Sequence, residues 1–173
     1  MAPRSPRRVF GAVAVAAALF GAACSAPHVT GTAASKIKQL PKDEIVGSYM
    51  GLTATREDIT GSLANQEANA YVSAVGLYAL RHNDLLDATL QVSKLSSKAK
   101  PKDPKFQQQV AAQIGGTAVQ EYVVGGKHVF RSSSRKQSLA AWFNGDYFYV
   151  LSVRDTYKYP RGLLRVLLTQ VNP

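Results

Sequence analysis

The segment LAAWFNGDYFYVLSV, residues 139–153, decides the fold because it places two apolar runs on either side of Asn144-Gly145. Asn-Gly between such runs is the strongest short-range signal for a β-hairpin with a two-residue turn. The second run is rich in aromatic and β-branched side chains, which favour strands. We therefore predict a hairpin of residues 139–143 and 146–153, with its second strand at the centre of a sheet.

Two more hairpins are expected earlier in the chain. Residues 119–124 and 127–131 are joined by Gly125-Gly126, which suits a two-residue turn with positive φ angles. Residues 74–95 contain the polar group Arg81-His82-Asn83-Asp84, which reads as an ordinary turn. Within 85–95 apolar and polar residues alternate with a period of two, which is typical of a half-buried strand.

Two helices carry recognisable start signals. Asp103-Pro104 places a capping side chain before a proline at the first helical position, and Gly115-Gly116 ends the helix. Pro160 opens the second helix, whose apolar stripe comprises Leu163, Leu164, Leu167, Leu168 and Val171. Thr55 and Asp58 have the spacing of a capping box, which favours a short third helix after them.

Runs of hairpins that are interrupted and closed by helices predict an α+β fold. We expect a curved antiparallel sheet of hairpins packed on one face by two or three helices. The other face of such a sheet can stay open as a binding surface. Residues 43–173 are expected to form a single α+β domain.

The first residues have the pattern of a signal peptide, predicted over residues 1–23. Residues 1–8 carry positive charge, and residues 9–23 form an uninterrupted apolar run that ends in small side chains. That run is shorter than the roughly 20 residues that a membrane-spanning helix needs. Cleavage and export are therefore favoured over a permanent anchor helix.

Gly21-Ala22-Ala23-Cys24 resembles a bacterial lipobox, in which small residues precede a cysteine that receives a diacylglyceryl thioether. The resemblance implies that Cys24 becomes the first mature residue and the point of lipidation. Gly21 departs from the pattern, since an aliphatic residue is usual there. Free secretion after a cut behind Ala23, and an uncleaved anchor, remain the alternatives. The succession of hairpins and helices also resembles small envelope lipoproteins of high-GC Gram-positive bacteria.

Residues 24–42 are interpreted as a flexible tether from lipidated Cys24. The stretch is rich in Ser, Ala, Thr, Gly and Pro and shows no apolar period. Cys24 is the only cysteine of the chain, so no disulfide within the chain is available. A thioether to lipid gives this solitary thiol a role outside the cytoplasm, where a free thiol is a liability.

The charge balance favours a polyanionic partner. The whole chain has a formal charge of +10, and without the leader it has 18 basic and 11 acidic side chains, or +7. An exported protein meets anionic lipid or wall polymer rather than nucleic acid, which we do not expect to be a partner. The candidate anionic-surface contacts form one group: Lys94, Lys98, Lys100, Lys102 and Lys105. The plainer interpretation of this group is a solvated loop between a strand and a helix.

No catalytic or metal-binding pattern is found. The chain lacks a nucleophile elbow, a zinc spacing and a calcium loop, so we predict no enzyme activity, no metal and no cofactor. His82 is followed by Asp84 and Asp87, which could orient an imidazole, but an ordinary turn explains the same residues.

These observations predict a lipid-anchored, exported protein at the outer face of the cell membrane, with a non-catalytic binding or accessory role. Its partner would be an envelope protein or an anionic wall or lipid component. The alternative is a carrier of a lipid or another apolar ligand, held between the curved sheet and the terminal helix.

Overall fold

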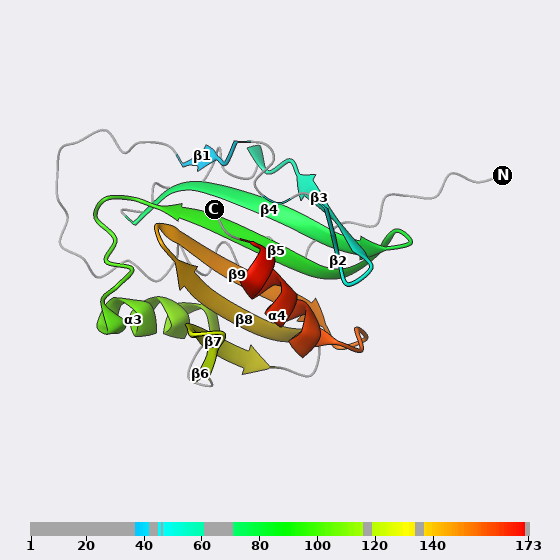
Figure 1. Cartoon of the computed structure of the whole chain (residues 1–173). Helices are drawn as coiled ribbons and strands as arrows, with labels where there is room; N and C mark the ends of the chain where they lie inside the picture. The colour runs from blue at the N-terminus through cyan, green and yellow to red at the C-terminus, as the bar shows by residue number, and fades with distance from the viewer. Residues whose placement is uncertain are drawn as a thin grey trace.

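One mostly antiparallel sheet and two helices make up the described part of a computed structural model, which covers residues 37–41, 45, 47–60, 71–115, 119–133 and 137–171 (Figure 1). The helices are α3 (Pro104–Gly115) and α4 (Pro160–Gln170). The strands are β1 (Lys38–Gln39), β2 (Gly47–Tyr49), β3 (Leu52–Glu57), β4 (Val72–His82), β5 (Leu85–Leu95), β6 (Gln120–Val124), β7 (Lys127–Ser133), β8 (Gln137–Asn144) and β9 (Tyr147–Arg154).

Eight strands follow the order β2-β3-β4-β5-β9-β8-β7-β6, and β1 pairs in parallel with the start of β4. The sheet is not closed into a barrel, so β2 and β6 lie at its two edges. The strand β9 lies between β5 and β8, which confirms the central position expected for residues 146–153. The sheet-dominated α+β class is likewise confirmed.

The three predicted hairpins are all present. Gly125 and Gly126 both have positive φ angles, 58° and 76°, and join β6 to β7 as predicted. Asn83 and Asp84 also have positive φ angles and join β4 to β5. The β8–β9 turn differs by one residue from the prediction, because Asn144 pairs with Tyr147 and the turn consists of Gly145-Asp146. Only Gly145 has a positive φ there, which is the type II′ pattern.

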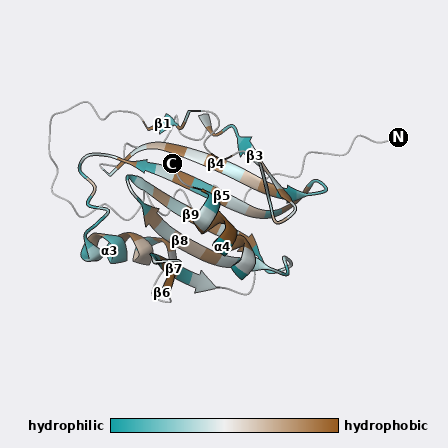
Figure 2. Ribbon diagram, in the orientation of Figure 1, coloured by the Kyte–Doolittle hydropathy of each residue, from teal (hydrophilic) through white to brown (hydrophobic). Residues whose placement is uncertain are grey.

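The two helices contact opposite sets of side chains along the strands. The apolar stripe of α4 packs with Tyr149, Leu151 and Val153 of β9, whereas α3 packs with Phe148 and Val150 of the same strand. Since successive strand residues point to opposite faces, α3 and α4 cover opposite faces of the sheet. Packing of both helices on one face, which we expected, is therefore not seen. Hydrophobic segments recur along the strands and on α4 (Figure 2).

The helix cap predicted at residues 103–104 is present, whereas Thr55 of the capping box predicted at residues 55–58 lies in a strand. Asp103 Oδ1 accepts the N–H of Lys105 at 2.9 Å at the start of α3. Thr55 lies inside β3 and does not begin a helix. Asp58 Oδ1 instead accepts the N–H of Thr60 at 3.0 Å. The helix predicted after it falls outside the described residues.

The last residues of the predicted tether belong to the sheet. Ile37 and Leu40 are buried, and the Leu40 N–H donates to the Val75 carbonyl oxygen at 2.9 Å. These two apolar side chains fix β1 against β4 because burial removes them from water. The folded part thus extends to residue 37 at least, instead of beginning at residue 43.

Candidate binding surfaces

Cys24 and the signal peptide predicted for residues 1–23 lie outside the described residues, as do residues 24–36 of the predicted tether. The helices of the described part are too short and too polar to cross a membrane.

The lysine group occupies one end of the sheet, which we call the basic end: Lys94, Lys98, Lys100, Lys102 and Lys105. All five side chains are exposed, from the end of β5 through the following loop to the first turn of α3. The Lys94 ammonium lies 5.9 Å from the centre of the Tyr147 ring. None of the five forms an ion pair with another residue in the described ranges. Their charge is therefore available to an anionic surface.

The register of β1 places the beginning of this strand at the basic end. Ala74 of β4 pairs with Lys38 on one side and with Lys94 on the other, so the three residues form one row across three strands. The described chain begins one residue earlier, at Ile37. Figure 1 shows β1 and the loop from β5 to α3 on the same side of the molecule. The first described residue, Ile37, therefore lies at the end of the sheet where the lysines gather.

An exposed aromatic ring lies beside these lysines. Tyr71 is 44% exposed, and its ring meets the Phe106 ring edge-on with centroids 5.4 Å apart. The Tyr71 carbonyl oxygen accepts the N–H of Ser96 in the loop that carries the lysines. A tyrosine at such a boundary presents an apolar body and a polar tip, which suits a membrane interface.

A second surface lies at the β6 edge of the sheet. Tyr122 and Val123 are 42% and 66% exposed, although both are large apolar residues. Between β6 and α4 lies an open groove of about 410 Å³, lined by Val123, Val124, Gly125, Arg165, Leu168 and Thr169. Lys127 Nζ donates to the Leu168 carbonyl oxygen at 3.0 Å, which ties the β6–β7 hairpin to the end of α4. No pattern in the sequence indicates this surface, because its exposure depends on the order of the strands.

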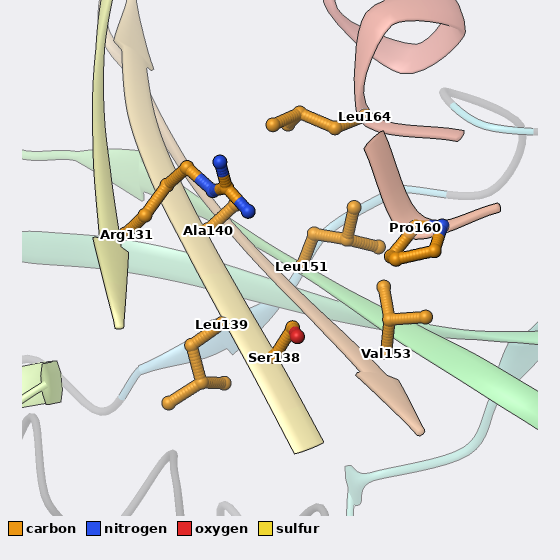
Figure 3. A pocket seen from close by; sticks show the side chains of 8 residues that line it. All are labelled: Arg131, Ser138, Leu139, Ala140, Leu151, Val153, Pro160 and Leu164. Atoms are coloured by element: carbon orange, nitrogen blue, oxygen red, sulfur yellow. The ribbon is translucent and has the colours of Figure 1, made fainter. Parts of the chain in front are cut away.

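A small pocket lies under the first turn of α4 (Figure 3). Arg131, Leu151 and Leu164 line it from β7, β9 and α4, and its volume is about 10 Å³. A cavity of that size holds roughly one water molecule. It is too small for a lipid or another apolar ligand.

The two histidines in the described part of the chain do not form a site with each other. His82 ends β4 beside the Asn83-Asp84 turn, and His128 Nδ1 lies 2.5 Å from Glu121 Oε1 on the neighbouring strand β6. Within the described ranges no three His, Cys, Asp or Glu side chains come together as a metal site would require.

Comparison with known proteins adds no information about function to the fold and the surfaces described above. No protein-family model, no curated protein and no solved structure matches this chain.

Proposed function

We propose that this chain is an exported lipoprotein, anchored through Cys24 at the outer face of the cell membrane, with a non-catalytic binding or accessory role. The leader and the solitary cysteine support the anchor. One structural observation adds most support to the proposal: Ile37, the first described residue after the predicted tether, lies at the basic end. If the lipid anchor and the basic surface lie at the same end of the domain, both can interact with the same membrane.

The length of the tether agrees with this orientation. Twelve residues lie between Cys24 and Ile37, and a flexible chain of that length spans about 20 Å r.m.s.. The Debye length in 0.15 M salt is about 8 Å, so the lysines must come close to the headgroups to interact with them. A domain on so short a tether meets the membrane repeatedly, and its basic end is the part nearest the attachment point.

Two attractions then combine. A lipid anchor gives strong but orientation-free attachment, and a lysine near an anionic leaflet contributes about 1 kcal/mol more. The lysines would turn the domain so that its opposite end, with the β4–β5 turn and the start of α4, faces away from the membrane.

The anchor is tested by Cys24→Ser in a bacterium that processes lipoproteins, with Ser25→Ala as a matched control next to the cut. We expect the unaltered chain and the Ser25→Ala variant to enter the detergent phase with a mature mass that includes lipid. Cys24→Ser should stay in the aqueous phase or accumulate as the precursor. An unchanged mature mass and unchanged membrane association of Cys24→Ser would overturn the lipid anchor.

The carrier alternative has one feature in its favour, the groove between β6 and α4. Its volume of about 410 Å³ falls in the range of small-molecule sites, but it is open to solvent along its length. The pocket under α4, where the carrier alternative placed its ligand, holds roughly one water. Non-catalytic recognition of a macromolecular partner is therefore the better-supported proposal.

A further inference from the structure

We propose that β6 is a docking strand for an extended, acidic segment of a partner protein. The segment would extend the sheet by pairing with β6 and would place an apolar side chain in the groove beside α4. This inference rests on the proposed binding role, but it does not depend on the lipid anchor.

The backbone of β6 offers the hydrogen-bonding groups for such an extension. In a two-residue hairpin the flanking pair, here Val124 and Lys127, exchanges both backbone hydrogen bonds, and the pattern alternates along the strands. Glu121 and Val123 consequently direct their N–H and C=O groups away from β7. No residue in the described ranges makes a hydrogen bond to these four groups. They form a free template for one more strand.

The other edge of the sheet lacks this property. There β2 has only three residues, and Gly47, Met50 and Gly51 around it have positive φ angles. Short and irregular edges of this kind prevent further pairing. By contrast β6 is five residues long, and it carries exposed Tyr122 and Val123 without a proline or a lysine. The unprotected edge is therefore specific to β6.

The groove supplies side-chain selectivity. Side chains of an added strand alternate between the two faces, so every second one would point toward α4. There it would meet Val124 and Leu168, which line the groove. The hydrogen bond from Lys127 Nζ to the Leu168 carbonyl oxygen holds the hairpin and the helix together before any partner arrives. A preformed groove lowers the entropic cost of binding.

The charge around β6 selects an acidic occupant. Arg165 lines the groove, and the Arg131 guanidinium lies 5.4 Å from the centre of the Tyr122 ring. The helix α4 carries Arg161 and Arg165 and no acidic residue. The one carboxylate of β6, Glu121, is already paired with His128. A second copy of this chain would bring two such basic helices together along the seam, which opposes self-association.

Binding is tested with the chain from residue 24 onward carrying Cys24→Ser, and with fluorescent heptapeptides as probes. The first probe alternates valine and glutamate, the second alternates valine and lysine, and the third is the valine–glutamate peptide with alternate backbone nitrogens methylated. Fluorescence anisotropy should show saturable binding of the first probe alone. Equal binding of the N-methylated probe would overturn strand pairing, and preference for the lysine probe would overturn the charge argument. Binding of none of the three overturns the proposal.

Two variants locate the site. Val123→Pro removes an outward N–H without breaking the β6–β7 ladder and should weaken the binding about tenfold, because it leaves one fewer hydrogen bond and an unpaired carbonyl. Val123→Ala keeps that N–H and serves as its control. In hydrogen exchange, the amides of Glu121 and Val123 should gain protection when the probe binds. Unchanged exchange at both amides would refute pairing at β6.

Self-association is the competing outcome. A concentration-dependent dimer in analytical ultracentrifugation that Val123→Pro abolishes would show that a second copy occupies the edge, and it would overturn the acidic partner. Failure of the Cys24 fractionation test has no bearing on these measurements. Failure of peptide binding in a chain that is anchored normally removes this inference and leaves the anchor in place.

Discussion

Neutralising the lysines of the basic end should weaken attachment to anionic membranes far more than removing equal charge elsewhere. We take Lys98, Lys100 and Lys102, which are exposed and lie in the loop between β5 and α3. Each lysine near an anionic leaflet raises the partition constant about fivefold, so Lys→Gln at all three should lower it roughly 100-fold. The effect should shrink as salt rises, because screening shortens the reach of each charge.

The assay is co-sedimentation of the Cys24→Ser chain with vesicles of phosphatidylglycerol and phosphatidylcholine. The matched control replaces Arg154, Lys158 and Arg161 by Gln, which removes the same net charge. Arg154 lies seven residues along β9 from Tyr147, the partner of Lys94, and thus about 23 Å from the basic end. In the proposed orientation these three residues face away from the membrane. The control should therefore change the logarithm of the partition constant by less than about a third as much as the lysine variant does.

Equal losses in the two triple variants would refute the orientation, because they would show that only net charge matters. Binding of the unaltered protein to acidic wall polymer, with none to vesicles, would refute the lipid surface as the target of the lysines. A Tyr71→Ser variant adds an independent check, since an interfacial ring should contribute at every salt concentration.

Four further predictions concern stability and ligand content. Leu167→Ala, in the buried stripe of α4, should lower the free energy of unfolding by about 2–5 kcal/mol in urea, whereas exposed Arg165→Ala should change it by less than about 0.5 kcal/mol. Gly145→Ala should lower the melting temperature, because φ is 56° there and an L side chain costs about 1 kcal/mol. Hydrogen bonds from Thr60 lower the pKa of Asp58 below its ordinary value of 3.8. The stability that this carboxylate adds is therefore present above pH 3.8 and is lost as the pH falls through the pKa of the folded state. Asp58→Asn should flatten the dependence of the urea midpoint on pH in this acidic range. Native mass spectrometry of the Cys24→Ser chain should give the bare polypeptide mass, and a retained lipid would favour the carrier alternative.

Local signals in the sequence predicted most of the hairpins and caps. Gly125-Gly126 and Asp103 act through neighbouring backbone groups, so their effect is visible within a few residues. The predicted β8–β9 turn was one residue too early, because Asn144-Gly145 and Gly145-Asp146 both suit a two-residue turn. Pairing of Asn144 with Tyr147, which the sequence does not specify, selects the second.

The arrangement of the helices and of β1 could not be predicted in this way. Residues 147–151 read as one continuous apolar run, and such a run is typical of a strand covered on both faces. This pattern could have indicated that α3 and α4 lie on opposite faces of the sheet. The strand β1 has two residues and pairs with Ala74 and Val75, more than thirty residues away, so no local period marks it.

The two candidate surfaces also differ in how far the sequence predicts them. The lysine group is visible in the sequence, but its position beside the tether depends on the row that joins Lys38, Ala74 and Lys94. The exposed edge depends on strand order alone, since QEYVV reads the same at an edge or in the middle of a sheet.

The parallel pairing of β1 has a mechanical consequence for an anchored protein. A pull transmitted through the predicted tether would act on Ile37, the first described residue, and on β1, the shortest of the described strands. There the load is carried by the buried side chains of Ile37 and Leu40 and by a few backbone bonds to β4. Peeling β1 away lengthens the tether by about 3.3 Å per residue while the eleven-residue pair β4 and β5 stays intact. In the lipid-anchored form that we propose, β1 would therefore detach first under load and leave the rest of the sheet folded.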